Sequence, residues 1–150
     1  MKKLKLGLPK GSLQENTFEL FRKAGFKIRA EDRSYKPWCD DEELDITLVR
    51  AQEIPAYVEK GVFDCGITGR DWILEMNAAV HEVAELRYAK SGFRPVRWVV
   101  AVPEDSPVRT IRQLRGKRIA TELVNYVRRY FKAKRIPVDV EFSWGATEVK

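Results

Sequence analysis

The sequence predicts an α/β protein with mostly parallel sheets, divided into two lobes. Short apolar segments of strand type alternate with amphipathic segments of helical type along most of the chain, and turn residues separate them. Alternation of this kind is typical of a parallel sheet covered by helices on both faces. A segment with glycine and proline leads to a candidate hinge at 91–96, between a first lobe at 1–90 and a second, incomplete lobe at 97–150.

Three strand–helix units are expected in the first lobe. The first has a strand with period-two alternation, then a helix that begins with a capping box at 12–15 and ends at Gly25, a residue suited to the left-handed C-cap. The second helix has Pro55 near its start and Gly61 after its end. The predicted segments are, in order, strand 4–8, helix 12–24, strand 45–49, helix 55–60, strand 63–67, a turn at 68–69 and helix 71–76.

The rest of the chain repeats the alternation less regularly. Apolar runs at 80–88 and 97–102 predict two further strands, one on each side of the hinge. Thr110 is expected to cap a short helix. The segments that follow are helix 110–114, strand 118–121, helix 123–134 and strand 138–142.

Composition describes a globular chain with an anionic partner. The 150 residues are 44% hydrophobic and 33% charged, enough for one core or two small ones. The net charge of +6 and pI near 9.4 favour nucleic acid, a membrane surface or a multiply phosphorylated small molecule, and charge does not choose among them. Two distant cysteines and one histidine match no familiar zinc spacing. Without an apolar signal core or a membrane-length apolar run, the chain is expected to be soluble and cytoplasmic.

Parallel sheets bind ligands at the carboxyl ends of their strands, so the loops after the strands are the candidate site. Lys10 and Ser12 stand where a strand meets a helix N-terminus, which favours an anion, although a capped helix with a solvated lysine explains them equally well. Arg50 follows a buried strand, and its planar fork suits a phosphate. A surface pair of Arg50 with Asp45 or Glu53 is the alternative.

Two further loops hold candidate binding residues. Thr68 and Gly69 form a turn where backbone can approach a ligand closely, and Asp71 can accept from a ribose hydroxyl; a plain tight turn is the alternative. Thr121 and Glu122 repeat this arrangement in the second lobe, where helix capping is the simpler interpretation. The basic residues of 109–135 read as a solvated face rather than as a nucleic-acid surface.

Taken together, four loop segments resemble those of the ATP phosphoribosyltransferase family. They are LPKGSL at 8–13, LVRAQEIP at 48–55, DCGITGRDW at 64–72 and EFSWGATE at 141–148. The resemblance implies two α/β lobes of the solute-binding-protein type (type II periplasmic-binding fold). It implies that an adenine ring nitrogen of ATP attacks the anomeric carbon of phosphoribosyl pyrophosphate, releasing pyrophosphate with Mg²⁺ bound, in the first step of histidine biosynthesis. It further implies a homo-oligomeric full-length enzyme, without nucleic-acid or membrane partners.

The resemblance also assigns roles to the candidates. Lys10 and Arg50 are the expected catalytic residues and face the anionic substrates with Ser12, while Thr68, Gly69 and Asp71 line the nucleotide side. Thr121 and Glu122 are the second lobe's expected contribution.

One departure concerns the C-terminal side of the family pattern. The family's ribose-phosphate loop and, in its long form, a histidine-sensing region follow the 141–148 segment, whereas this chain ends at Lys150. We therefore expect a truncated chain that binds adenine nucleotide weakly and makes no product. The alternative is a non-catalytic, two-lobed domain that binds an anionic ligand.

Overall fold

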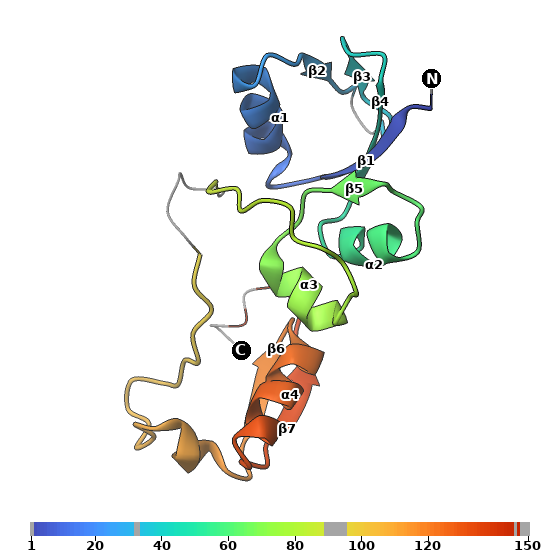
Figure 1. Ribbon diagram of the computed structural model, residues 1–150. Coiled ribbons are helices and arrows are strands. Elements are labelled where there is room, and N and C mark those ends of the chain that lie inside the picture. Colours follow the sequence, from blue (N-terminus) through green and yellow to red (C-terminus); the bar gives the residue numbers. More distant parts are fainter. Residues whose placement is uncertain (1, 32–33, 89–95, 146, 148–150) are drawn as a thin grey trace. The chain divides into compact units, whose positions relative to one another are not determined.

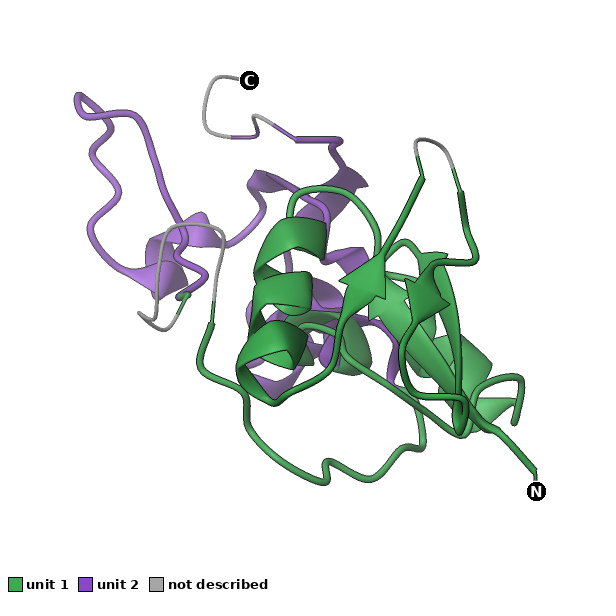
Figure 2. Cartoon of the chain, turned by 90° about the horizontal axis from the view of Figure 1, so that it is seen from above, with its two compact units in different colours: residues 1–73, 78–96 green, residues 74–77, 97–150 purple. Residues whose placement is uncertain are grey.

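The chain divides into two compact units (Figure 2). The computed structural model describes residues 2–31, 34–88, 96–145 and 147. The first unit comprises residues 1–73 and 78–96, and the second comprises 74–77 and 97–150. The predicted hinge at 91–96 lies, apart from Val96, outside the described residues, so the predicted lobe boundaries stay a prediction.

The first unit is built on a three-stranded parallel sheet in the order β4–β1–β5 (Figure 1). Its strands are β1 (Leu4–Pro9), β4 (Leu44–Val49) and the short β5 (Cys65–Gly66). Leu6 pairs with Ile46 and Leu8 with Leu48 in register, and all four side chains are buried. Alternate residues of a strand share one face, so these four form a continuous apolar layer.

Helices cover both faces of this sheet. The apolar layer packs against Phe18 and Phe21 of α1 (Gln14–Lys23). The opposite face carries Gly7 and Gly66, which pair with each other in register. Here α2 (Ile54–Glu59) approaches so closely that a Cβ added to Gly66 would lie 2.5 Å from Ile54 Cγ2. The predicted α/β class with parallel strands and two covered faces is therefore confirmed for this unit.

The ends of α1 match the prediction at one end only. Gly25 adopts φ +97° and its N–H donates to Arg22 O, which confirms the predicted stop. The predicted capping box is wrong, because Leu13 and not Ser12 is the N-cap residue, no side-chain capping bond is found at this described helix start, and the helix begins at Gln14. A backbone turn replaces it: Gly11 has φ +96° and its carbonyl accepts from Gln14 N at 3.0 Å. The turn therefore starts the helix without the Ser12 hydroxyl.

Three short elements complete the first unit. Strands β2 (Ile28–Arg29) and β3 (Trp38–Cys39) form an antiparallel pair that the sequence did not predict. Two residues are too few for a hydrophobic period to show. Helix α3 (Arg70–Met76) begins in this unit at the predicted place, and its last three residues belong to the second unit.

The second unit pairs β6 (Arg118–Thr121) with β7 (Asp139–Phe142) in parallel. Helix α4 (Val124–Ala133) connects the two strands, and the 3-10 helix η1 (Ile111–Leu114) precedes them. Phe131, Leu114 and Ile136 are the buried centre of this unit. The three predicted segments at 118–121, 123–134 and 138–142 are confirmed within one residue at each end.

The two strands predicted at 80–88 and 97–102 are wrong. In the described part of the chain neither segment pairs with a strand. Val83 is 86% exposed, and Val96, Trp98, Val99 and Val100 are exposed as well. Alternating apolar residues suit a pleated surface, but a strand forms only where a neighbour takes up its backbone hydrogen bonds.

Candidate functional site

Two predicted site residues, Lys10 and Arg50, lie together at the carboxyl edge of the first unit's sheet. Lys10 follows β1 directly and Arg50 follows β4 directly, and these strands are neighbours. Lys10 N donates to Val49 O at 2.8 Å, which extends the ladder to the edge. The edge surrounds a hollow of about 300 Å³ lined by Lys10, Gly11, Tyr35, Val49, Arg50 and Glu53.

The ammonium of Lys10 has defined partners inside this hollow. Its Nζ donates to Ser34 O at 3.1 Å and lies 3.8 Å from the centre of the Tyr35 ring. The lysine is half-buried rather than extended into solvent. It therefore presents a positive charge at a fixed place on the wall of the hollow.

Arg50 presents its charge differently. The side chain is exposed, and within the described residues it forms no ion pair. Asp45 binds Lys36 instead, with Nζ 2.7 Å from Oδ1, and Glu53 meets Arg50 only through a backbone bond from its N–H to Arg50 O at 2.9 Å. The surface pair of Arg50 with Asp45 or Glu53 is thus not found in this structure. The guanidinium keeps its five donors for a ligand.

The loop after β5 is joined to the loop after β4. Thr68 Oγ1 donates to Ala51 O at 2.7 Å. Asp71 lies in the first turn of α3, where its Oδ1 accepts from Trp72 N at 2.9 Å. Its carboxylate occupies the space that a Cβ at Gly69 would need, so a side chain at Gly69 would require Asp71 to turn away.

Six predicted residues do not line the hollow: Thr68, Gly69 and Asp71 of the loop after β5, and Ser12, Thr121 and Glu122. Ser12 is exposed in the turn before α1. Thr121 and Glu122 belong to the second unit, at the carboxyl ends of its strands. Thr121 Oγ1 accepts from Leu123 N at 3.1 Å and Glu122 Oε1 accepts from Gly145 N at 2.8 Å. Both side chains therefore organise the backbone at the start of α4 and after β7.

Four residues of the hollow were not predicted as site residues: Gly11, Tyr35, Val49 and Glu53. Gly11, Val49 and Glu53 lie beside the predicted residues in the sequence, and Glu53 was expected only as a possible partner of Arg50. Tyr35 belongs to a loop with no recognisable motif. It reaches the site because its carbonyl accepts from Leu48 N at 2.8 Å, which places the loop beside β4. That contact joins residues distant in sequence, so no local pattern signals it.

The chemistry available here is electrostatic. Burial raises the pKa of the Cys65 thiol, and the neighbouring charge of Asp64 raises it further, so the thiol in β5 stays protonated at neutral pH.

Among the described residues, no three His, Cys, Asp or Glu side chains gather in a way that could hold a metal ion. None of the described helices is long and apolar enough to cross a membrane. Binding and orienting an anion is what Lys10 and Arg50 can do.

A parallel α/β sheet with two cations at its carboxyl edge is typical of proteins that bind phosphorylated small molecules. Residues 50–150 match the family model described as HisG: ATP phosphoribosyltransferase. The chain belongs to the ATP phosphoribosyltransferase family.

Relatives and a solved structure agree with this membership. The chain is 68% identical over 149 residues to the ATP phosphoribosyltransferase of Thermodesulfovibrio yellowstonii, covering 99% of this chain and 51% of that one. It is 59% identical over 147 residues to that of Chlorobium phaeovibrioides, covering 98% and 50%. It spans about half the length of these curated relatives.

Among solved structures, the chain is similar to the ATP phosphoribosyl transferase (HisG:HisZ) complex from Thermotoga maritima. The TM-score is 0.74 at 27% identity, with 97% of this chain and 66% of that chain covered. The predicted fold class, an α/β protein of the solute-binding type, is confirmed.

Proposed function

We propose that this chain provides substrate-binding residues for the transfer of the phosphoribosyl group of phosphoribosyl pyrophosphate to the adenine ring of ATP, the first step of histidine biosynthesis. The observation that carries the proposal is the placement of Lys10 and Arg50 on one hollow at the carboxyl edge of the sheet. Both substrates carry several phosphate charges, which these two cations suit.

The reaction asks for orientation more than for acid–base chemistry. The lone pair of the adenine ring nitrogen forms the new bond to the anomeric carbon, and the electrons of the broken carbon–oxygen bond leave with pyrophosphate. Neutral adenine already offers that lone pair, so no strong base is required. Lys10 and Arg50 act by holding phosphates in line and by stabilising charge on the leaving group.

The remaining candidates complete the proposal. Thr68, Gly69 and Asp71 line the nucleotide side, because their loop is fastened to the loop of Arg50. Ser12 is exposed two positions after Lys10 in the sequence, and its hydroxyl is available to a phosphate oxygen. Thr121 and Glu122 are the second unit's contribution.

Mg²⁺ is proposed to enter with the substrate phosphates. The hollow offers one carboxylate, Glu53, and Mg²⁺ is commonly held by one or two carboxylates together with substrate phosphates. When bound, the ion neutralises phosphate charge. The single carboxylate therefore fits a Mg²⁺ ion that is bound jointly by the protein and the substrate phosphates, and does not fit a site made of protein ligands alone.

The cellular setting follows from the same family membership. We place the reaction in the cytoplasm and propose that the longer enzyme is oligomeric; the solved neighbour is described as a HisG:HisZ complex. A non-catalytic domain that binds an anionic ligand remains the second candidate, because the exposed Arg50, which forms no ion pair with any described residue, serves it equally well.

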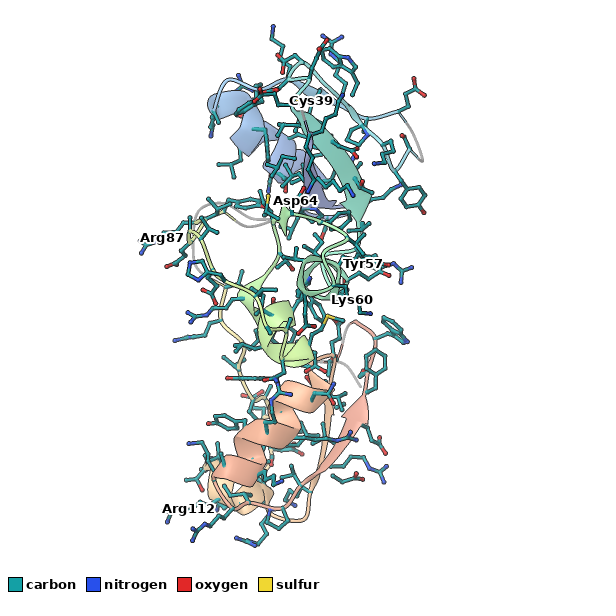
Figure 3. All side chains as sticks on the ribbon, turned by 45° about the vertical axis from the view of Figure 1, so that its right-hand side comes forward. Cys39, Tyr57, Lys60, Asp64, Arg87 and Arg112 are labelled. Carbon is teal, nitrogen blue, oxygen red and sulfur yellow. The ribbon has the colours of Figure 1, made fainter. Side chains whose placement is uncertain are left out.

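Titration calorimetry with Mg·ATP and with Mg·phosphoribosyl pyrophosphate tests the proposal. Arg50→Ala is expected to weaken binding at least about tenfold, because a hydrogen bond to a charged group contributes about 1.5–3 kcal/mol. Arg112→Ala is the matched control, since Arg112 projects exposed from η1 in the second unit (Figure 3), and it should change affinity less than about twofold.

The alternatives have their own signatures in this experiment. No saturable binding of either substrate, or equal losses in the two variants, contradicts the proposal. Tripolyphosphate binding as tightly as ATP favours the non-catalytic anion-binding domain. Tight duplex DNA binding with a steep salt dependence would favour a nucleic-acid surface.

A further inference from the structure

We propose that Tyr35 is a positioning residue for Lys10. Its ring holds the lysine ammonium at the wall of the hollow and thereby sets the affinity for a phosphorylated substrate. The inference rests on the proposed function for the identity of that substrate. The contact itself is a property of the chain alone.

The ammonium of Lys10 is held at two points. The Tyr35 ring centre lies 3.8 Å from Nζ, and the Ser34 carbonyl accepts a hydrogen bond from Nζ at 3.1 Å. A ring face attracts a cation through its quadrupole. An ammonium has three donors, so a carbonyl and a ring still leave donors for a phosphate oxygen.

The backbone, and not burial, fixes the place of the ring. Tyr35 is 63% exposed, yet its carbonyl accepts from the buried Leu48 of β4 at 2.8 Å. On either side, Ser34 Oγ accepts from Lys36 N at 3.1 Å, and Lys36 Nζ pairs with Asp45 Oδ1 at 2.7 Å. The loop is thus fastened along β4, with the ring beside the Lys10 ammonium.

Removing the ring should release the lysine. A lysine side chain has many rotamers, so ordering it on ligand binding costs entropy. The contact with Tyr35 orders Lys10 before the ligand binds and so removes this cost from the binding step. An exposed cation–π contact corresponds to about a two- to fivefold change in an equilibrium constant. We therefore expect Tyr35→Leu to weaken Mg·ATP binding about two- to fivefold.

Tyr35→Phe separates the ring from the hydroxyl. It keeps the ring and should bind Mg·ATP like the unaltered chain. Trp38→Leu is the matched control, because Trp38 is an exposed aromatic residue of the neighbouring β3 that does not line the hollow. It should leave affinity unchanged.

A double-substitution cycle distinguishes positioning from a general structural effect. If Tyr35 acts through Lys10, Tyr35→Leu adds no loss once Lys10→Ala is present. Additive losses, or a Tyr35→Leu variant that binds as tightly as the unaltered chain while Lys10→Ala binds weakly, would overturn the proposal.

The contact also has a signature without ligand. Ring current should move the ε-methylene proton resonances of Lys10 upfield in the unaltered chain and in Tyr35→Phe, and back to the ordinary lysine position in Tyr35→Leu. Absence of that shift in the unaltered chain overturns the proposal as well. If the unaltered chain binds neither Mg·ATP nor Mg·phosphoribosyl pyrophosphate, the proposed function fails, and this resonance then decides the role of Tyr35 by itself.

Discussion

The hydroxyl oxygens of Tyr88 and Thr17 lie 2.9 Å apart, although 71 positions separate them in the sequence. Thr17 is the fully buried residue of α1, and its hydroxyl also donates to Leu13 O at 2.8 Å. In the segment after α3, the side chains from His81 to Arg87 are exposed, and Tyr88, which follows them, is partly buried. Figure 3 labels Arg87. Tyr88 therefore fastens an otherwise extended segment to the first helix.

This contact predicts alkaline instability. Burial raises the pKa of Tyr88 above its ordinary value of 10.0. The folded state therefore holds the proton to higher pH than the unfolded state, and its contribution to stability is present below the unfolded pKa and lost as pH rises through the folded one. Between pH 8 and pH 10.5, the free energy of unfolding measured in urea should fall more for the unaltered chain than for Tyr88→Phe. An equal fall in the two chains would contradict this.

The paired glycines of β1 and β5 predict a steric penalty. A Cβ at Gly66 would lie 2.5 Å from Ile54 Cγ2 and 3.1 Å from the Gly7 carbonyl, so Gly66→Ala forces α2 away from the sheet. Overpacking of this kind costs about 1–3 kcal/mol. Urea unfolding measures it, with Ser12→Ala, an exposed turn residue, as the control expected within about 0.5 kcal/mol. A Gly66→Ala variant as stable as the control would show that this face is not tightly packed.

The end of α3 predicts a stability effect in the second unit. Glu75 accepts from Asn125 N at 2.9 Å and from Tyr126 N at 2.8 Å, at the N-terminus of α4. Glu75→Ala should cost about 0.5–2 kcal/mol, as loss of a cap does. Glu75→Gln should cost less, because it removes only the charge that favours the helix dipole. Denaturant midpoints followed by far-ultraviolet circular dichroism test this order, with the exposed Glu104→Gln as the control.

The thiol of Cys65 predicts slow alkylation. Since burial raises its pKa, the reactive thiolate is scarce at pH 8. In a Cys39→Ser variant, iodoacetamide should react with Cys65 several-fold more slowly than with free N-acetylcysteine, and the difference should shrink as pH rises above 9.0. Equal rates at pH 8 would count against a shielded thiol.

How far the sequence predicts the fold depends on the length of each signal. Strands 4–8 and 45–49 carry enough apolar residues in sequence to be recognised, and the helix after each of them is followed by a glycine with positive φ, Gly25 or Gly61. The strands β2 and β3 have two residues each and are defined by their pairing alone. The start of α1 was less predictable, because a backbone turn at Gly11 takes the place of the expected side-chain cap, whereas the predicted cap at Thr110 is found.

The candidate site shows the same division. The sequence predicts that Lys10 and Arg50 lie close together, because each follows a strand directly and neighbouring parallel strands end at the same edge of the sheet. Tyr35 could not, since a hydrogen bond between its loop and Leu48 places it there. The same rule identifies Thr121 and Glu122 as strand-end residues, and the bond from Leu123 N to Thr121 fits the expected role at a helix start. The bond from Gly145 N to Glu122 joins residues 23 positions apart, which no local pattern signals.

The exposed run at 96–102 has a consequence for how copies of this chain behave at high concentration. Valines and a tryptophan there face solvent, and Arg97 is the charge within the run. Uncharged, β-prone segments of five to seven residues that are exposed to solvent template cross-β aggregation between molecules. The stretch 98–102 should therefore be where precipitation begins, and Val99→Lys would act as a gatekeeper that delays it.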